Sequence, residues 1–409
     1  MDNVFDVLQA RGFVQQVTHP ELLRQRLGTQ SLTFYIGYDP TANSLHVGNL
    51  LTIMAMVHMQ RAGHRPLVIL GGGTAMVGDP SGKTAMRQML TPETIAQNAQ
   101  ALRGQLQRYL RLDDDQGAQL LNNADWLAEL KYIEFLRDIG RHFSVNRMLT
   151  FEAYKQRMET GLSFLEFNYQ LLQAYDFLVL YQRHGCLLQM GGDDQWGNMV
   201  AGVDLIRRVA EGDAFALTFP LLTTASGQKM GKTAAGAVWL DAELTTPYEF
   251  YQFWINVDDR DVSRFLRYYT LLPLEDIARL EALQGADVRQ AKETLAFAVT
   301  TLTHGEAAAR TAQQAARALF DGTGDLVGVP ETALSQVRLA AGVPVIDLLV
   351  ETGLAASKSA ARRLIQQGGA TLNGTRLAQL EAVITSADLH EGALLLRAGK
   401  KHYHRVVVA

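Results

Sequence analysis

The pattern of hydrophobic and polar positions changes along the chain and indicates more than one domain. Up to about residue 220, short apolar runs that end in glycine, at 67–73 and 187–192, alternate with stretches of helical periodicity such as 50–57. This alternation is typical of a parallel sheet covered by helices. Ligands of such sheets bind at the carboxyl ends of the strands, which is where these glycine clusters fall. The pattern therefore predicts an α/β domain over residues 1–246.

The pattern becomes helical from Pro247 to about Phe320. One apolar face recurs there at helical spacing, with Val288, Ala291, Leu295, Val299 and Leu302 as its members. We predict a separate α-helical domain over 247–320. Glycine and aspartate residues then interrupt the pattern, so we predict a linker over 321–340 and a small α+β segment over 341–409.

Composition narrows the class of protein. A chain of 409 residues with 47% hydrophobic content exceeds the usual size of a single core. Its one cysteine, Cys186, excludes an intramolecular disulfide and a multi-cysteine zinc site, which favours a reducing compartment. The start of the chain lacks a signal-peptide pattern, and no run approaches the roughly 20 apolar residues that span a bilayer. We therefore expect a cytoplasmic protein with no membrane segment.

Two nucleotide-binding motifs are approached but not met. Residues 78–84 resemble a P-loop, but only three residues separate the two glycines and Val77 stands where the first glycine belongs. The glycines at 71–73 lack the third glycine of the dinucleotide fingerprint, because Met76 occupies its place. A P-loop NTPase and an NAD enzyme are thus disfavoured. No paired-histidine helix or cysteine cluster offers metal ligands, so no protein-bound metal is predicted.

A strand, a turn and a helix are predicted in succession over residues 34–51, with His46 and Gly48 at the start of the helix. Helix N-termini present free N–H groups and a partial positive charge, which suit a phosphate chain. Far downstream, Lys229 and Lys232 frame a glycine-containing loop and could neutralise that phosphate from the other side. Taken alone, His46 would favour a structural histidine at a turn, and the two lysines would favour a solvated surface loop. Together they predict a nucleotide site closed by a mobile cationic loop.

A polar stripe marks another predicted helix. Tyr169, Gln173 and Asp176 have the spacing i, i+4, i+7 and share one face of a helix with apolar neighbours. Such a stripe meets water, finds partners or faces a ligand pocket. Residues 191–198 follow a strand shortly afterwards and add further carboxylate and amide groups. This proximity favours the pocket.

Together these motifs resemble those of bacterial tyrosyl-tRNA synthetases, and the resemblance covers essentially the whole chain. Residues 46–49 (His-Val-Gly-Asn) resemble the HIGH signature of class I aminoacyl-tRNA synthetases, and residues 229–233 (Lys-Met-Gly-Lys-Thr) resemble KMSKS. The remaining motifs follow in the family's order at 35–41, 78–82, 169–176 and 192–198. The resemblance implies a Rossmann-like catalytic domain, an α-helical anticodon-side domain and a small S4-like RNA-binding domain.

The resemblance also implies a role for each position. Tyr35 and Asp176 would meet the phenol of substrate tyrosine, and removing that hydroxyl would leave buried polar groups unpaired, which disfavours phenylalanine. The remaining tyrosine contacts would come from Asp79, Tyr169 and Gln173 at the ammonium group and Gln195 near the carboxylate. The ATP-binding positions would be Gly37, Asp39, Thr41, His46, Gly48, Asn49, Gly192, Asp194 and Lys232. The catalytic positions around the pyrophosphate would be His46, Lys83, Arg87, Lys229, Lys232 and Thr233.

The implied reaction is tyrosine–tRNA ligation. Tyrosine carboxylate attacks the α-phosphorus of ATP, pyrophosphate leaves, and the tyrosyl group passes to the terminal adenosine of tRNA(Tyr). An ionised carboxylate needs no general base, so positioning and charge stabilisation suffice. His46 is then a hydrogen-bond donor to a phosphate oxygen. Mg²⁺ is expected only as the counterion of ATP.

The final segment, 341–409, resembles the S4 RNA-binding module. It carries +3 within a chain of net charge −4, which suits a phosphate-binding appendage. Its candidate RNA contacts are Lys358, Arg362 and Arg363, and the alternative of a solvated basic face is disfavoured by the helix-turn-strand pattern of this segment. Arg207 and Arg208 are candidates for contact with the acceptor stem, and a helical surface pair is equally consistent with them.

Two other functions remain open from the sequence. A tryptophanyl-tRNA synthetase shares the fold and both signatures, but Tyr35 with Asp176 and the basic tail argue against it. A non-catalytic RNA-binding paralogue is disfavoured by His46, Lys229 and Lys232. The implied partners are L-tyrosine, ATP and tRNA(Tyr), and a homodimer is expected from the resemblance alone.

Overall fold

The computed structural model describes residues 3–81, 89–112, 117–225, 227, 230–233, 236–321, 329–390, 392–399 and 402–409, with the backbone alone at 232–233 and 319–321. The chain forms two compact units. The first comprises Met1–Gly231, Trp239–Asp241 and Arg260–Ala282, and the second comprises Lys232–Val238, Ala242–Asp259 and Leu283–Ala409.

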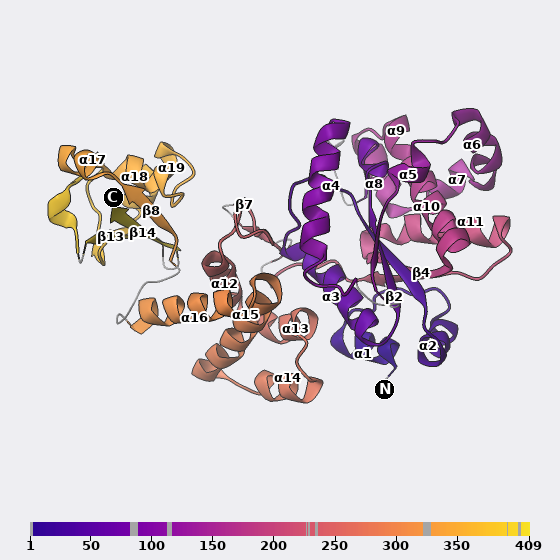
Figure 1. Ribbon diagram of the computed structural model, residues 1–409, viewed down its shortest axis with the longest axis horizontal. Coiled ribbons are helices and arrows are strands. Elements are labelled where there is room, and N and C mark those ends of the chain that lie inside the picture. The colour runs from indigo at the N-terminus through magenta and orange to yellow at the C-terminus, as the bar shows by residue number, and fades with distance from the viewer. Residues whose placement is uncertain are drawn as a thin grey trace. The chain divides into compact units, whose positions relative to one another are not determined.

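A five-stranded parallel sheet forms the centre of the first unit (Figure 1). Its strands lie in the order β3-β2-β1-β4-β5. Their bounds are β1 (Thr33–Tyr38), β2 (Arg65–Leu70), β3 (Gln119–Asn122), β4 (Cys186–Gly192) and β5 (Phe215–Phe219). The strands β2 and β5 are buried along almost their whole length, as expected where helices cover both faces. The predicted α/β class is confirmed.

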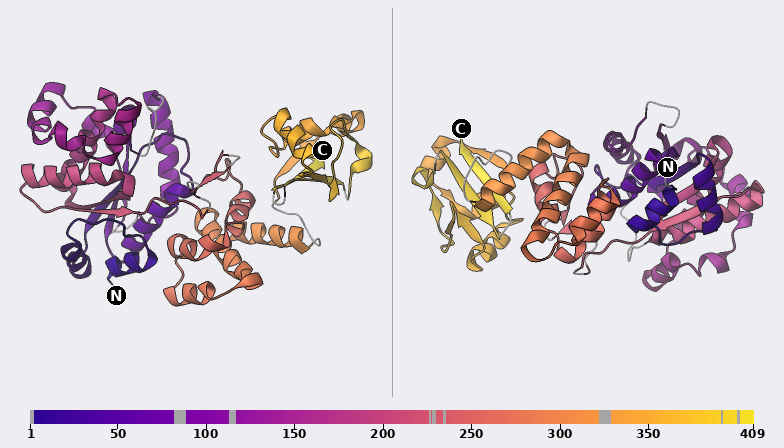
Figure 2. Two further views of the ribbon diagram at one scale, coloured as in Figure 1. Left: turned by 180° about the vertical axis from the view of Figure 1, so that it is seen from behind. Right: turned by 90° about the horizontal axis from the view of Figure 1, so that it is seen from below.

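Helix α3 lies on one side of this sheet and helices α10 and α11 lie on the other (Figures 1 and 2). The side chains of Leu67 and Ile69 in β2 pack with Phe177 of α10 and Leu205 of α11 in one core. The helices up to residue 209 are α1 (Val4–Arg11), α2 (Pro20–Thr29), α3 (Val47–Arg61), η1 (Thr74–Met76), α4 (Pro92–Leu106), α5 (Ala124–Leu127), α6 (Tyr132–Asp138), η2 (Gly140–His142), α7 (Val145–Met148), α8 (Glu152–Thr160), α9 (Phe164–Phe167), α10 (Tyr169–His184), η3 (Asp193–Gln195) and α11 (Trp196–Val209). Within the described parts of the chain, none of the helices has the length and apolar character that crossing a bilayer requires.

Two helices beyond residue 258 belong mainly to this first unit: α13 (Asp259–Tyr269) and α14 (Leu274–Glu281). The guanidinium of Arg11 donates to the carbonyls of Arg267 at 3.1 Å and Thr270 at 3.0 Å, and the Tyr268 hydroxyl donates to the Gly12 carbonyl at 3.0 Å. The structure therefore divides the predicted helical domain 247–320. Periodicity shows that a helix buries one face, but it does not show which partner covers that face.

The helical part of the second unit consists of α12 (Pro247–Ile255), η4 (Gly285–Asp287), α15 (Val288–His304) and α16 (Glu306–Asp321). Of the predicted apolar face, Ala291, Leu295 and Val299 are buried along α15. A short hairpin of β6 (Lys232–Thr233) and β7 (Gly236–Ala237) also belongs to this unit.

A second five-stranded sheet, of mixed direction, forms the C-terminal fold in the order β11-β10-β13-β14-β8. Its strands are β8 (Glu331–Leu334), β10 (Ala370–Leu372), β11 (Thr375–Arg376), β13 (Ala393–Ala398) and β14 (His402–Val408). The accompanying elements are α17 (Gln336–Ala341), β9 (Val343–Pro344), α18 (Val345–Glu351), α19 (Lys358–Gln366), β12 (Val383–Ile384) and η5 (Ser386–Asp388).

This fold begins earlier than the sequence predicts. Strand β8 pairs with β14, and Leu334 and Leu339 are buried in the C-terminal core. Residues 331–340, which lie within the predicted linker 321–340, are therefore part of the C-terminal fold. The pattern missed them because β8 is a four-residue edge strand with two exposed side chains.

Candidate active site

A cavity of about 510 Å³ lies at the carboxyl ends of the parallel strands in the first unit. The strand order reverses between β1 and β4, and such a switch point is where open α/β sheets bind ligands. The turns after four strands and the inner face of α10 contribute the polar lining. These contributors include Asp39, Thr41, His46, Thr74, Asp79, Asn123, Tyr169, Gln173, Asp176, Asp194 and Gln195.

Most of the residues predicted from the sequence come together in this cavity. Those that line it are Tyr35, Gly37, Asp39, Thr41, His46, Asn49, Asp79, Tyr169, Gln173, Asp176, Gly192, Asp194 and Gln195. Gly48 lies beside it in the first turn of α3. Lys83, Arg87 and Lys229 lie outside the described residues, and Lys232 and Thr233 are described only as backbone in β6.

Asp176 is one of the two buried carboxylates that line the cavity among the described residues. Its Oδ1 accepts a hydrogen bond from the Trp126 indole N–H at 2.7 Å, and its Oδ2 accepts one from Asn123 at 2.9 Å. Burial raises the pKa of Asp176 to about 7, against these two hydrogen bonds, and the charge of Asp39 adds to the rise. Trp126 and Asn123 were not predicted, because they follow a short strand and no periodic pattern marks them.

Three buried polar atoms of the lining have no hydrogen-bond partner among the described residues: the Tyr35 hydroxyl and the Oε1 atoms of Gln173 and Gln189. Leaving such a group unpaired costs about 1–3 kcal/mol, so their convergence indicates a polar ligand. Burial and the charge of Asp176 raise the pKa of Tyr35 well above its usual value, which keeps its hydroxyl protonated. Gln189 escaped prediction, although a glutamine within the apolar strand β4 was the available signal.

A chain of hydrogen bonds leads from Tyr169 along the cavity wall. The Tyr169 hydroxyl donates to Asp39 Oδ2 at 2.8 Å, and the Thr74 hydroxyl donates to Asp39 Oδ1 at 2.7 Å. Asn123 donates to the Thr74 hydroxyl at 3.0 Å. Asp39 is thus fixed from two sides. Gly71 permits this arrangement, because a Cβ at Gly71 would lie 2.0 Å from Asp39 Oδ1.

Asp79 and Gln195 are joined directly. Gln195 Nε2 donates to Asp79 Oδ2 at 2.7 Å, and the backbone N–H of Ser81 donates to Asp79 Oδ1 at 2.9 Å. Asn198 in turn donates to Gln195 Oε1 at 3.2 Å. This network orients a buried carboxylate toward the same cavity as Tyr169.

His46 caps helix α3. Its Nδ1 accepts a hydrogen bond from the Gly48 N–H at 3.0 Å, while the Asn49 side chain accepts one from the His46 N–H at 3.1 Å. Because Nδ1 is an acceptor, the proton of the neutral imidazole resides on Nε2, which makes Nε2 a donor. Gly48 is required sterically, since a Cβ there would lie 2.7 Å from His46 Cε1. Asn49 therefore has a capping role that the sequence did not predict.

The described part of the lysine loop lies against the same helix start. Gly231 has a φ of 81°, and a Cβ there would lie 2.7 Å from Val47 Cγ2. Met230 is buried beside it. After the loop, Trp239 pairs with His46 in a β-bridge, with ring centroids 6.1 Å apart. The structure thus brings together two motifs that are far apart in the sequence.

The candidate acceptor-stem residues lie at the end of α11. Arg207 is exposed and pairs with Asp204 at 3.3 Å. Arg208 is also exposed and donates to the carbonyl of His142.

The three candidate RNA-binding residues of the C-terminal fold lie on α19. Lys358 pairs with Asp347 at 2.7 Å, whereas Arg362 and Arg363 are exposed and pair with no carboxylate among the described residues. The opposite face of the helix buries Ala361 and Ile365. Within the described chain, no three His, Cys, Asp or Glu residues are grouped to hold a metal ion.

Comparison with known families identifies the family to which this chain belongs. Residues 27–321 match the family described as tRNA synthetases class I (W and Y). Residues 325–406 match the Tyrosine–tRNA ligase SYY-like C-terminal domain. The chain belongs to this class I tRNA synthetase family.

The family includes synthetases for tryptophan and for tyrosine, and individual relatives show which of the two this chain resembles. The chain is 52% identical over 408 residues to the tyrosine–tRNA ligases of Clostridium botulinum (strain Alaska E43 / Type E3) and Clostridium beijerinckii, with 100% of each chain covered. A C-terminally truncated mitochondrial tyrosyl-tRNA synthetase from Aspergillus nidulans has a similar structure, with a TM-score of 0.71 and 30% identity over 78% of this chain and 95% of that chain. A tryptophanyl-tRNA synthetase from Encephalitozoon cuniculi, at 13% identity and a TM-score of 0.56, shares the fold alone. The family and the tyrosine–tRNA ligase activity that the sequence predicted are confirmed.

Proposed function

We propose that this enzyme binds L-tyrosine with its phenol between Tyr35 and Asp176. The observation that carries this proposal is the buried Asp176 carboxylate beside the unpaired Tyr35 hydroxyl in one cavity. A phenol can donate to the carboxylate and accept from the Tyr35 hydroxyl. A ligand without a hydroxyl leaves the Tyr35 hydroxyl unpaired and offers no donor to the buried Asp176 carboxylate, which penalises phenylalanine.

The other end of tyrosine is assigned to a cluster of polar side chains. Asp79, Tyr169 and Gln173 would surround the ammonium group, and Gln195 would lie near the carboxylate. The unpaired Oε1 of Gln173 supports this assignment, since an ammonium group supplies only donors. The direct bond between Gln195 and Asp79 would hold the two groups close to the same end of the substrate.

Activation requires stabilisation of negative charge more than proton transfer. The tyrosine carboxylate oxygen forms a bond to the α-phosphorus of ATP, and the bond to pyrophosphate breaks. We assign to His46 Nε2–H and the start of α3 the role of donors to phosphate oxygens. The remaining charge would come from Lys83, Arg87, Lys229, Lys232 and Thr233. Mg²⁺ would arrive with ATP, bound chiefly by phosphate oxygens and water.

The adenylate would occupy the part of the cavity between β1 and β4. The residues proposed to surround it are Gly37, Asp39, Thr41, Gly48, Asn49, Gly192 and Asp194. Gly192 allows close approach there, because a Cβ would lie 2.6 Å from Asp194 Oδ1. Asp39 and Asn49 would act in part through the groups that they hold, Tyr169 and His46.

The tRNA contacts are proposed on two surfaces. Arg207 and Arg208 would contact the acceptor stem, and Lys358, Arg362 and Arg363 would contact tRNA phosphates elsewhere. The absence of ion-pair partners for Arg362 and Arg363 among the described residues supports the second surface, because unpaired arginines are available to phosphates. The cytoplasm is proposed as the location, since tRNA and ATP occur there and a single cysteine suits a reducing compartment.

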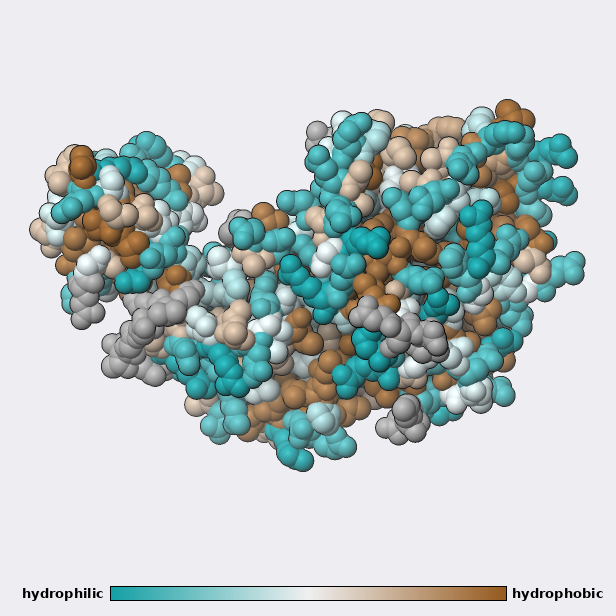
Figure 3. Space-filling model, viewed as in Figure 1, coloured by the Kyte–Doolittle hydropathy of each residue, from teal (hydrophilic) through white to brown (hydrophobic). Residues whose placement is uncertain are grey.

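A homodimer is proposed through the α6–α9 part of the first unit. Large apolar side chains are exposed there, including Ile133 at 73% and Phe164 at 70%, and hydrophobic residues are visible at the surface near α6 (Figure 3). Such a patch is typical of an interaction surface. Sedimentation tests the proposal: Ile133→Glu with Phe164→Glu should give monomers, whereas Val337→Glu, at an exposed apolar residue of α17, should not. A monomeric wild type would refute it.

Exchange of labelled pyrophosphate into ATP tests the substrate assignment. Exchange should depend on L-tyrosine and proceed poorly with tryptophan or phenylalanine. Comparable exchange with tryptophan would overturn the tyrosine pocket. Binding of tRNA without exchange for any amino acid would indicate a non-catalytic paralogue.

A further inference from the structure

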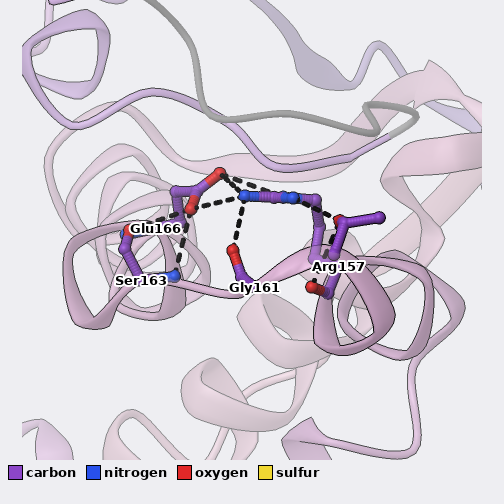
Figure 4. Close-up of polar contacts among 5 residues, drawn as sticks. Arg157, Gly161, Ser163 and Glu166 are labelled. Carbon is purple, nitrogen blue, oxygen red and sulfur yellow. Dashed lines mark hydrogen bonds and ion pairs between the residues drawn. The ribbon is translucent and has the colours of Figure 1, made fainter.

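A buried ion pair closes the turn between α8 and α9 (Figure 4). The Arg157 guanidinium reaches both oxygens of the Glu166 carboxylate, with its Nη2 3.1 Å from Oε1 and 3.0 Å from Oε2. The two side chains are only 2% and 3% exposed. None of the family motifs quoted above includes either residue.

Both residues of the pair form further hydrogen bonds within the turn. Arg157 also donates to the Thr160 hydroxyl at 2.6 Å and to the Gly161 carbonyl at 2.8 Å. Glu166 accepts from the Ser163 N–H at 3.1 Å and from the Ser163 hydroxyl at 2.8 Å, completing the capping box of α9. Burial opposes ionisation of Glu166, but the hydrogen bonds from Arg157 and Ser163 outweigh it and lower the pKa of Glu166. The carboxylate is therefore charged and held at neutral pH.

A tyrosine of α8 ties the start of this turn to the end of α9. Tyr154 lies three residues before Arg157 on α8 and donates its hydroxyl hydrogen bond to the Phe167 carbonyl at 3.0 Å. Its ring packs on Phe167 with centroids 5.2 Å apart. Burial raises the pKa of Tyr154, and the nearby Asp79 carboxylate adds to the rise. Tyr154 thus fixes α8 to Phe167, the residue before the cap that α9 shares with α10.

The turn also leads directly into the substrate helix. Helix α9 ends at Phe167, and its C-cap Asn168 is at the same time the N-cap of α10. Tyr169 is the first residue of α10 and lines the cavity. A shift of α9 would therefore move Tyr169 with it.

We propose that Arg157 and Glu166 are positioning residues for tyrosine binding, which set the place of Tyr169 in the cavity that it lines together with Asp79. This inference rests on the proposed binding of the tyrosine ammonium group by Asp79 and Tyr169. Neither Arg157 nor Glu166 touches the substrate. Their effect falls on tyrosine affinity, because on the ATP side of the cavity the start of α3 is unaltered and the Thr74 hydroxyl still holds Asp39 when Tyr169 shifts.

The test compares Arg157→Lys and Glu166→Gln with the wild type. Lysine retains the charge but not the fork that spans both carboxylate oxygens, and glutamine retains the shape but not the charge. The dissociation constants of tyrosine and of ATP are measured by equilibrium dialysis, under conditions in which circular dichroism and sedimentation match the wild type. We expect the tyrosine constant to rise about tenfold in both variants and the ATP constant to change less than about twofold.

A second ion pair in the same unit provides a matched control. Arg267 Nε and Nη2 donate to the two oxygens of Glu281 at 2.6 Å and 2.7 Å, and the Ser263 hydroxyl donates to the same carboxylate at 2.7 Å. The Glu281→Gln variant removes a pair of the same chemistry from α13 and α14. It should lower the thermal midpoint while leaving tyrosine affinity within about twofold of the wild type.

The outcomes distinguish a failure of the proposed tyrosine pocket from a failure of the proposed positioning role. Failure of the wild type to bind tyrosine would overturn the proposed pocket itself. Normal tyrosine binding by the wild type and by both variants of the pair would overturn only the positioning role. Equal losses of tyrosine and ATP affinity would show a general loss of structure and would also overturn it.

Discussion

The indole nitrogen of Trp126 donates a 2.7 Å hydrogen bond to the carboxylate of Asp176, tying the helix after β3 to α10 at the floor of the cavity. The second oxygen of this carboxylate accepts from Asn123. Asp176 is therefore oriented before a ligand arrives. Because this carboxylate is buried, bulk water would not compete with a ligand phenol for hydrogen bonds to it.

The pKa of Asp176, raised by burial to about 7, predicts a pH dependence of tyrosine binding. In the proposed complex the phenol donates to the ionised carboxylate, so tyrosine affinity should fall as the pH falls through about 7. The stability contribution has the opposite sign: the folded chain holds this proton more tightly than the unfolded chain, so stability decreases as the pH rises toward 7. Titration of tyrosine by equilibrium dialysis measures the first effect. The Asp176→Asn variant should bind weakly and lose this pH dependence, and retention of the full dependence would assign it to another group.

Trp126→Phe should weaken discrimination between tyrosine and phenylalanine. The change preserves most of the aromatic volume and removes one hydrogen bond to a charged group, worth about 1.5–3 kcal/mol. We expect tyrosine-dependent exchange to lose about tenfold or more in kcat/KM, with little change for phenylalanine. Equal losses for both amino acids would show that Trp126 supports the fold and not the phenol contact.

His46 has two roles that different substitutions separate. His46→Ala removes both the cap of α3 and the Nε2 donor, whereas His46→Asn retains a side chain that can cap a helix. Both variants should slow adenylate formation, by about 10²–10³-fold if the donor acts as in an oxyanion hole. Tyrosine affinity should stay near that of the wild type. Only the alanine variant should also lose about 1 kcal/mol of stability, and full activity in the asparagine variant would refute the donor role.

The sequence predicted those parts of the site that lie in strong local patterns. His46 follows a strand and begins a helix, and Tyr169, Gln173 and Asp176 recur on one helical face, so their convergence at a sheet edge could be inferred. Asn123 and Trp126 could not, because β3 has four residues and α5 has four, too few to show a period. Their importance emerges only from contacts with Asp176, which lies more than 45 positions away.

Domain boundaries were predicted less well for a related reason. Helical periodicity at residues 260–282 gives no sign that the partner of this stretch is α1, near the start of the chain. Likewise β8 pairs with β14, about 70 residues later. Such long-range pairing is decided by tertiary packing, and local propensity carries little information about it.

Charge removal at Arg362 and Arg363 should weaken tRNA binding and flatten its salt dependence. Each phosphate contact that is lost removes about 0.9 from the slope of log affinity against log salt on a duplex. The control is Arg405→Gln, which removes an arginine already paired with Glu331 at 2.9 Å. Filter binding over a range of salt measures the slope. Equal slopes for Arg362→Gln with Arg363→Gln and for the wild type would place the RNA contact elsewhere.

Removal of the C-terminal fold should separate amino-acid activation from tRNA charging, provided that the chain is cut at the right place. A chain ending at Asp321, the last residue of α16, keeps the whole tyrosine cavity and leaves no part of the second sheet behind. Its tyrosine-dependent exchange should approach that of the full chain, while charging of tRNA(Tyr) should fall steeply. A chain cut after residue 340 would keep β8 without β14 and would expose Leu334 and Leu339 to water, so it should aggregate more readily. Exchange and charging are measured on one preparation of each chain. Charging that survives the cut at Asp321 would show that the C-terminal fold does not bind the tRNA, and loss of exchange there would show that the cavity depends on it.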